Sequence, residues 1–308
     1  MKDKGMREPS YLRLHRDGKL KERIDQAVTL LSECCLCPRE CNVDRLAGEL
    51  GFCRTGGKAR VASLHAHFGE ESPLVGSGGS GTIFFRSCNL LCYFCQNYDI
   101  SHDSGGGEVE PRELAHMMLS LQKRGCHNIN FVTPSHVVPQ ILQALAIAVE
   151  GGLTVPLVYN TGGYDKCDTL KLLEGVFDIY MPDFKFWDEE WSEKFCKAAD
   201  YRKIVTAAVK EMHRQVGDLA IDESGIAFRG LLVRHLVMPN DVANTEKVMT
   251  FLADNVSEDT YVNVMDQYHP CGKALRDSAI NRRITRAEYA EAIRRTRQAG
   301  LHRLDSYR

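Results

Sequence analysis

The sequence lacks a long apolar run, a large excess of one charge and a signal-like beginning. Its 308 residues include 39 Lys or Arg and 41 Asp or Glu, so the formal net charge is -2. This balance does not indicate a basic nucleic-acid binder or a polybasic membrane protein. No stretch is long and apolar enough to span a bilayer, and residues 1–16 are polar and charged. We therefore expect a cytoplasmic protein with no membrane partner and no indicated nucleic-acid partner.

A complete phosphate-binding loop is lacking too. Residues 76–81 form a Gly/Ser run, GSGGSG, but the Gly-Lys-Ser/Thr ending of such loops is missing. We therefore expect this run to lead into a strand and not to bind a nucleotide.

Cysteine, in contrast, is abundant, with twelve in the chain. In a reducing cytosol, clustered cysteines bind metal or do chemistry more often than they form structural disulfides. Five of them lie in residues 34–53 and three in residues 88–95. We expect the other four to be small buried apolar residues. They are scattered along the chain as Cys126, Cys167, Cys196 and Cys271.

Short apolar strands alternate with helices from residue 81 onward. Six segments have the composition of strands buried on both faces: 82–87, 128–133, 155–160, 177–183, 231–238 and 261–266. This alternation predicts an α/β fold with a parallel sheet, either open or curved into a barrel. Side chains at the carboxyl ends of the strands would then carry the chemistry.

The patterns divide the chain into three parts: residues 1–75, 76–271 and 272–308. The first part holds an amphipathic helix at 20–33 and a cysteine-rich segment that we expect to be mostly loop. The second is the alternating core. The third is a helical extension, whose last helix starts at the capping box around Thr285.

Three cysteines directly follow the first core strand, in Cys88-Asn-Leu-Leu-Cys92-Tyr-Phe-Cys95. Thiolates are soft ligands for iron–sulfur clusters and for zinc. Three of them can hold three corners of a cubane and leave the fourth iron free to bind a substrate. A structural zinc ion would need a distant fourth ligand, because such sites normally have four protein ligands. The spacing favours a [4Fe-4S] cluster and leaves zinc as the alternative.

This loop, with Phe94 before the third cysteine, resembles the CX3CX2C signature of radical S-adenosylmethionine (SAM) enzymes. The resemblance implies an oxidoreductase with a partial (β/α)6 parallel barrel, a [4Fe-4S] cluster and SAM. Reductive cleavage of SAM would yield a 5′-deoxyadenosyl radical that abstracts hydrogen from a substrate. The resemblance also implies reduced flavodoxin or ferredoxin as the electron donor. The cofactor does the difficult chemistry, and the protein positions and shields it.

The strand ends resemble the pyruvate formate-lyase activating enzyme branch of that superfamily. Asn160-Thr161-Gly162 stands where the branch has a Thr-Asn-Gly turn, and Asp183-Phe184-Lys185 resembles its Asp-x-Lys. Arg234 resembles the arginine of its Arg-x-Val-x-x-Pro, and His269 the histidine of its Pro-Tyr-His. Together these likenesses imply that a single SAM pocket is lined by Phe94, Asn160, Gly162, Asp183, Lys185, Arg234 and His269.

Two stretches depart from the family pattern. Where many radical SAM proteins have Gly-Gly-Glu, this chain has Thr133-Pro134-Ser135-His136, so backbone carbonyls or the hydroxyls of Thr133 and Ser135 would bind SAM instead. Activases carry Asp-Gly-Pro-Gly before the cluster strand, where this chain has Gly-Gly-Ser-Gly at 78–81. A protein glycine, as in glycyl-radical activation, is therefore one candidate substrate beside a peptide, a nucleoside or a small molecule.

Nearly the whole chain resembles an uncharacterised activase-like group that shares a Cys-x-Leu-Cys-Pro-Arg opening and the Asn-x-Val-Thr-Pro and Tyr-Asn-Thr-x-Gly-Tyr segments. In the first part of the chain, Cys34, Cys37, Cys41 and Cys53 form a C-x2-C-x3-C-x11-C pattern, which favours a closed metal site holding zinc or a second iron–sulfur cluster. Unmetallated cysteines are the alternative, although so short a segment has little core to hold it.

Two further expectations concern neighbouring histidines and the class of protein. His65 and His67 alternate on a predicted strand, and with no third ligand in sight we expect them to be ordinary surface residues. A zinc-stabilised binding module without catalysis is the alternative to an enzyme.

Overall fold

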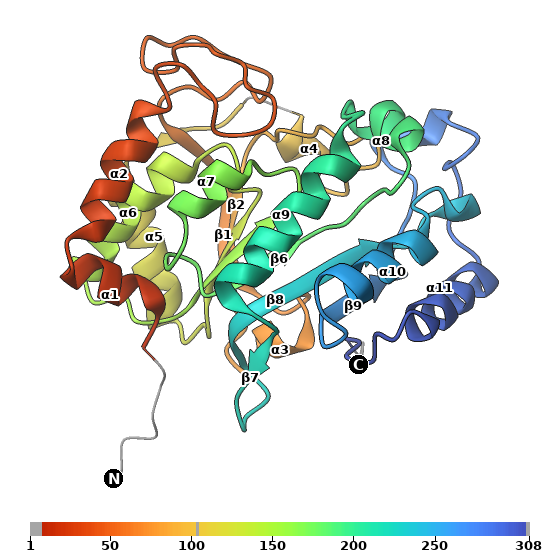
Figure 1. The fold of residues 1–308 in the computed structure, drawn as a ribbon. Helices are drawn as coiled ribbons and strands as arrows, with labels where there is room; N and C mark the ends of the chain where they lie inside the picture. The colour runs from red at the N-terminus through yellow and green to blue at the C-terminus, as the bar shows by residue number, and fades with distance from the viewer. Residues whose placement is uncertain (1–7, 103–104, 306–308) are drawn as a thin grey trace.

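Residues 8–102 and 105–305 are described by the computed structural model, and they form an α/β fold around a mostly parallel sheet (Figure 1). Six parallel strands make up the centre of the described sheet: β2 (Ser80–Phe85), β4 (Ile129–Val132), β5 (Leu157–Thr161), β6 (Ile179–Pro182), β8 (Ala227–Leu236) and β9 (Tyr261–Met265). Neighbours in this order pair with each other in parallel. The alternation therefore predicted the parallel sheet correctly, and the arrangement is consistent with a partial barrel.

Three shorter or outer strands pair antiparallel with this centre. β1 (Ala59–His67) pairs with β2, and β3 (Glu108–Val109) pairs with β1. β7 (Ala220–Ile221) forms a hairpin with β8. The division at residue 75 thus separates two strands that are hydrogen-bonded neighbours in one sheet.

Helices follow most of the parallel strands and cover the outer face of the sheet. Those between the strands are α4 (Tyr98–Ser101), α5 (Pro111–Lys123), α6 (Val138–Glu150), α7 (Cys167–Leu172), α8 (Glu189–Cys196), α9 (Tyr201–Val216) and α10 (Thr245–Asn255). The last, α11 (Arg286–Gln298), begins at the expected capping box and packs on α10. In the described part of the chain, no helix has the length and apolar character to cross a membrane.

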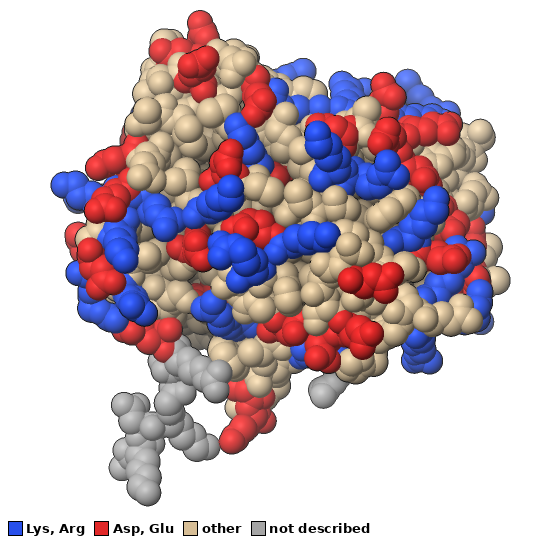
Figure 2. Space-filling view, in the orientation of Figure 1, with Lys and Arg blue, Asp and Glu red and all other residues tan. Residues whose placement is uncertain are grey.

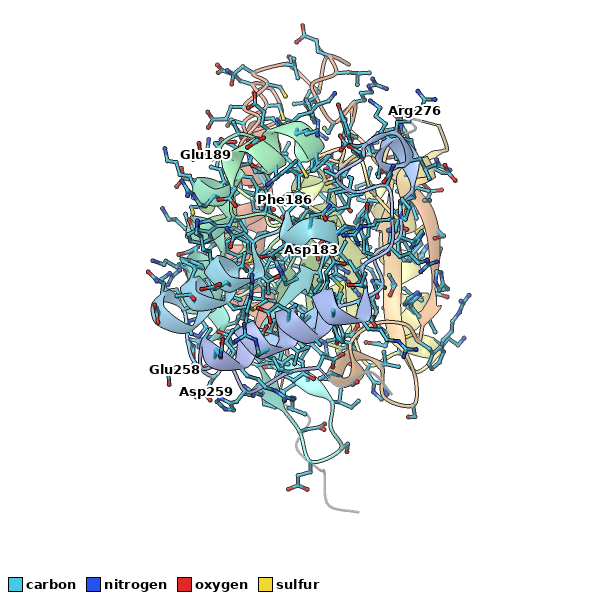
Figure 3. All side chains as sticks on the ribbon, turned by 90° about the vertical axis from the view of Figure 1, so that its right-hand side faces the viewer. Asp183, Phe186, Glu189, Glu258, Asp259 and Arg276 are labelled. Carbon is cyan, nitrogen blue, oxygen red and sulfur yellow. The ribbon has the colours of Figure 1, made fainter. Side chains whose placement is uncertain are left out.

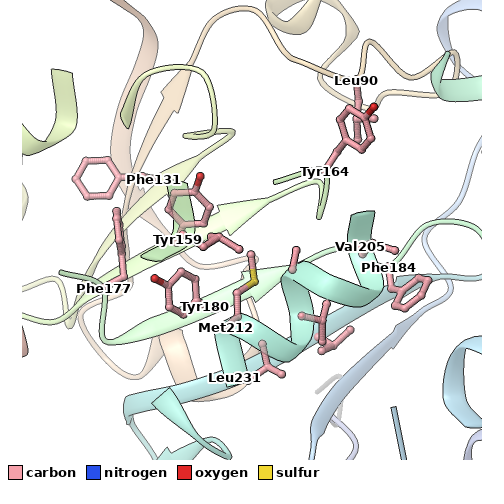
Figure 4. Packing of buried hydrophobic residues seen from close by; sticks show 14 of the residues in the cluster. Leu90, Phe131, Tyr159, Tyr164, Phe177, Tyr180, Phe184, Val205, Met212 and Leu231 are labelled. Atoms are coloured by element: carbon pink, nitrogen blue, oxygen red, sulfur yellow. The ribbon is translucent and has the colours of Figure 1, made fainter. Parts of the chain in front are cut away.

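The core between sheet and helices is rich in aromatic rings (Figure 4). Alternate strand residues point to opposite faces, so Phe131 and Tyr159 point outward towards the helices. Phe177 contacts both, with ring centroids 6.0 Å from Phe131 and 4.9 Å from Tyr159. Edge-to-face pairs of this kind add roughly 0.5–1.5 kcal/mol each beyond the burial of their area. This packing fixes the strands whose ends carry the polar residues.

The inner face of the sheet is filled by the segment that follows β1. Its short helix α3 (Ser72–Val75) buries Leu74 against Val158 of β5, Met181 of β6 and Leu232 of β8. Glu71, just before α3, accepts a hydrogen bond from Asn263 of β9. A segment from the start of the chain therefore closes the interior against the last strand.

The amino-terminal region differs from its predicted helix. In place of one helix at 20–33, the structure has α1 (Ser10–Arg16) and α2 (Lys19–Thr29). The residues after Thr29 are not helical because they bond to the cysteine-rich segment instead. The Leu31 carbonyl, for example, accepts a hydrogen bond from the Arg45 backbone N–H over 2.9 Å. This segment, residues 34–56, has no helix or strand and is hereafter called the knob (Figure 1).

Positive and negative side chains are interspersed over the face shown in Figure 2. This mixture agrees with the near-neutral formal charge of the sequence. Such a surface gives no large field of one sign that would attract a polyanion to this face.

Candidate functional site

A cavity of about 330 Å³ opens at the carboxyl ends of the parallel strands. Its volume is within the range of small-molecule sites. The loop after β2 contributes Cys88, Cys92 and Cys95 to its lining. Seven of the residues that were expected to bind the cofactor line it too: Phe94, Thr133, Asn160, Gly162, Asp183, Lys185 and Arg234. Residues that are far apart in the sequence therefore meet here because parallel strands end at one edge.

The three thiols of this loop have hydrogen-bond donors next to their sulfurs. Leu90 N–H donates to Cys88 Sγ over 3.3 Å, Ser101 Oγ donates to Cys95 Sγ over 3.2 Å, and the Cys196 thiol donates to Cys92 Sγ over 3.2 Å. Burial is the main cause that raises the pKa of Cys88 to about 12, and the neighbouring thiols Cys92 and Cys95 contribute to this rise. A metal centre bound here would have to displace these protons, since only the thiolate is a strong ligand.

The donor set suits a cluster better than a single ion. No group of three or more His, Cys, Asp or Glu side chains within residues 8–102 and 105–305 is arranged to hold one metal ion. In an iron–sulfur cubane each thiolate binds a different iron, so the sulfurs need not converge on one point. Three thiols with donors at their sulfurs, on the wall of a cavity, fit such a group.

A network of charged and amide side chains forms another part of the cavity wall. Arg234 Nε donates to Asp183 Oδ1 and its Nη2 to Asn160 Oδ1, both over 2.7 Å. Lys185 Nζ donates to the second oxygen of Asp183. Burial alone would raise the pKa of Asp183, but Arg234 and Lys185 more than offset it, so this pKa lies below its usual value. The carboxylate is held ionised near the centre of the molecule, whereas Glu258 lies at the periphery (Figure 3).

Sequence reasoning missed a second carboxylate in this network. Glu70 Oε2 lies 3.8 Å from Arg234 Nη1, and Glu70 Oε1 lies 3.6 Å from His67 Nδ1. Burial raises the pKa of Glu70, while Arg234 opposes the rise. Both Glu70 and His67 line the cavity, a position for His67 that the sequence did not indicate. The adjacent His-Phe-Gly-Glu-Glu run after the predicted strand was the signal available in the sequence.

Thr133 adopts an unusual backbone conformation directly after β4. Its φ is +62°, in the left-handed region that a β-branched residue rarely occupies. Its N–H donates to the Asn160 carbonyl over 2.8 Å, which ties the ends of β4 and β5 together. Strain of this kind persists only where the surroundings impose it, and it gathers at functional sites.

Two expected residues are not among the cavity lining. Ser135 is buried, and its hydroxyl lies 3.1 Å from the hydroxyl of Thr161, which does line the cavity. His269 is half-buried, with Nδ1 3.3 Å from the Gln267 carbonyl oxygen. Gln267, two residues earlier, lines the cavity instead.

Gly162 leaves room between two walls of the cavity. A Cβ added there would lie 2.8 Å from Leu90 Cδ1 of the cysteine loop and 3.5 Å from Lys185 Cε. The loop and the end of β5 therefore approach so closely that only glycine fits without movement.

Two of the scattered cysteines touch the cysteine loop, which the sequence did not suggest. Cys196 is buried, as expected, but its Sγ lies 3.2 Å from Cys92 Sγ. Cys271 is only half-buried, and its thiol donates to the Phe94 and Cys95 carbonyls over 3.2 Å. Cys196 is held beside the loop by α8, and Cys271 by the turn after β9. The spacing of cysteines in the sequence does not reveal either position.

Comparison with known proteins identifies relatives for most of the chain. The family model described as the radical SAM superfamily matches residues 82–252, more than half of the chain. "Uncharacterized protein MJ0674" of Methanocaldococcus jannaschii is 33% identical over 279 residues, which cover 88% of this chain and 76% of the relative. Both matches include the cysteine loop and most of the parallel strands.

Proposed function

This chain belongs to the radical SAM superfamily, and from that membership we propose that Cys88, Cys92 and Cys95 bind its [4Fe-4S] cluster. The enzyme uses a [4Fe-4S] cluster and SAM, which together supply a 5′-deoxyadenosyl radical after reduction. One observation carries the assignment of the site: the three cysteines and the Asp183 network line a single cavity.

We propose that the same cavity binds SAM through its charged wall. Arg234 and Lys185 can meet the SAM carboxylate, and an arginine can do so with two parallel hydrogen bonds. The ionised Asp183 can accept from the amino group. Asn160 can serve the ribose or the amino group, and the backbone carbonyl at Thr133 can take the place of the Gly-Gly-Glu stretch of many radical SAM proteins. These roles are supported by the positions of the side chains on one wall.

Apolar residues would shield the site from water. Phe94 is buried and packs edge-to-face on Phe186, with ring centroids 5.6 Å apart, and it contacts the tilted ring of Tyr268 at 6.3 Å. Its ring can pack near the adenine. Water exclusion strengthens the electrostatic contacts in the cavity and prevents side reactions. Ser135 would act indirectly in this scheme by holding Thr161, and His269 by positioning Gln267.

We also propose that the enzyme is activase-like. The Asp183–Lys185 pair and its contact with Arg234 support placement in the pyruvate formate-lyase activating enzyme branch. A protein glycine is one candidate substrate, and a peptide, nucleoside or small molecule is the alternative. Radical SAM chemistry needs a reductant, for which reduced flavodoxin or ferredoxin is proposed.

The assignment of the cysteines can be tested by changing all three to Ala. The triple variant should lose about four irons per chain, the content of one [4Fe-4S] centre. It should also stop forming 5′-deoxyadenosine from SAM and dithionite in anaerobic assays. Cys126→Ala, a buried cysteine of the core, should change neither reading. A colourless wild-type protein that contains only zinc would contradict the assignment and favour a zinc-stabilised binding module.

A further inference from the structure

Four free thiols lie in the knob, outside the lining of the cavity. Cys34 N–H donates to the Val43 carbonyl over 2.9 Å, and Asn42 N–H donates to the Cys34 carbonyl over 3.1 Å. The stretches of chain that carry Cys34 and Cys41 therefore lie side by side. None of these four cysteines is in a disulfide. The knob has only a small apolar core of its own to hold it in shape.

Hydrogen-bond donors point at sulfurs in the knob. Phe52 N–H donates to Cys41 Sγ over 3.3 Å, and the Arg39 N–H bonds to Cys37. Gly51 leaves the room for this, since a Cβ there would lie 2.7 Å from Cys41 Sγ. A neutral thiol is a weak acceptor, whereas metal-bound thiolates are commonly held by such donors. The thiols of the cavity loop have the same surroundings.

Arg45 is a second and independent sign of negative charge in the knob. Its side chain is 2% exposed, so the guanidinium is fully buried. It donates to the Gly56 carbonyl, to the His136 carbonyl and, over 3.7 Å, to Cys34 Sγ. No acidic residue of the described chain pairs with it. A buried cation without a counter-charge is unfavourable. A centre with four thiolates would supply that counter-charge.

We propose that the knob binds a second [4Fe-4S] cluster through Cys34, Cys37, Cys41 and Cys53. These cysteines are not arranged to hold a single metal ion, which argues against zinc. The same is true of the cavity cysteines, the ligands of the family's cluster under the proposed function. Each thiolate of a cubane binds a different iron, so cluster ligands need not converge on one point, and a cluster is compatible with both sets.

Arg39 links the knob to the cysteine loop of the cavity. Its Nε donates to the Asn89 carbonyl over 2.9 Å, and its Nη2 donates to the Cys196 carbonyl over 3.0 Å. The guanidinium also stacks on Phe52, 3.9 Å from the ring centroid. Asn89 follows the first cysteine of that loop directly. The proposed second cluster would therefore lie beside the first, where an electron-carrying centre is useful to an enzyme that needs a reductant.

The proposal is tested by metal analysis in the variant without the first site. The Cys88→Ala/Cys92→Ala/Cys95→Ala protein should retain about four irons and four sulfides per chain. Adding Cys37→Ser and Cys41→Ser should remove them, while adding Cys35→Ser, the neighbour outside the set, should not. Iron that vanishes with the first three cysteines, or zinc in its place, would overturn the proposal.

A measurement on the wild-type protein tests the proposal without variants, which could fail to fold. Mössbauer spectra of the anaerobic protein should account for about eight irons in two clusters. Addition of SAM should change the spectrum of one cluster, whose fourth iron is open, and leave the other unchanged. About four irons, all of them responding to SAM, would overturn the knob cluster and leave the proposed function intact. Two clusters that both ignore SAM would contradict the proposed function and leave the knob cluster standing.

Discussion

Glu71 is a buried carboxyl group that should make the stability of the protein depend on pH. Its side chain is 4% exposed. Oε1 accepts from Asn263 Nδ2 over 2.9 Å, and Oε2 has no partner among the described residues. Burial raises the pKa of Glu71 from 4.5 to about 7, Arg234 opposes the rise, and Glu70 adds to it. The folded protein therefore binds this proton more tightly than the unfolded chain does.

The sign and size of the effect follow from linkage. Below about pH 4.5 both states are protonated, so the carboxyl imposes no penalty. Between about pH 4.5 and 7 the unfolded state releases the proton first, and the folded state loses stability as the pH rises. Above about pH 7 the penalty is complete. A difference of roughly 2.5 pKa units corresponds to on the order of 3 kcal/mol.

Glu71→Gln should remove this penalty, because an amide keeps an oxygen acceptor for Asn263 and carries no charge. The variant should melt at about the same temperature as the parent near pH 5. At pH 8 it should melt higher by roughly 6–12 °C, given about 2–4 °C per kcal/mol for a large domain. Melting can be followed by fluorescence under anaerobic conditions at both pH values. The exposed Glu258→Gln is the matched control. A Glu71→Gln advantage that is equal at the two pH values would refute the reasoning.

Three further predictions concern the cavity. Arg234→Ala should keep its iron but bind SAM roughly 10–150-fold more weakly, since a charged hydrogen bond contributes about 1.5–3 kcal/mol; unchanged SAM affinity in equilibrium dialysis would remove Arg234 from the site. Gly162→Ala should weaken SAM binding severalfold, because the added Cβ would contact Leu90. Adding Leu90→Ala should restore SAM binding, and failure of that rescue would point to a backbone effect. Ser101→Ala removes a donor to Cys95 Sγ and should lower the reduction potential of the cluster in a redox titration; an unchanged potential would show that the hydrogen bond is absent in the loaded enzyme.

The sequence predicted the parts of the site that obey a local rule. Strand–helix alternation located the strand ends, and parallel strands bring such ends to one edge, so Asn160, Asp183 and Arg234 meet as expected. Glu70 was not predicted as a site residue, because its contact with Arg234 depends on how the chain folds back after β1. No local pattern records a contact between residues so far apart in the sequence.

Other departures have physical causes of the same kind. Ser135 follows the turn at Thr133, where the positive φ redirects the chain, so its hydroxyl faces Thr161. Cys196 reaches the cysteine loop from the end of α8, and spacing alone gave it no role. The knob metal stays a prediction, which composition suggested and which the buried Arg45 now supports.

Residues 71–75, which fill the inner face of the sheet, have a consequence for how the protein folds during its synthesis. Its Glu71 bonds to Asn263, which lies 192 residues later in the chain. At 5–20 residues per second, roughly 10–40 s pass between the synthesis of these two positions. During that delay the early cysteines have already emerged, while the last wall of the cavity does not yet exist. Contacts over such a separation also slow folding. Newly made thiols are thus exposed to solvent before the enclosure that surrounds them in the folded protein is complete.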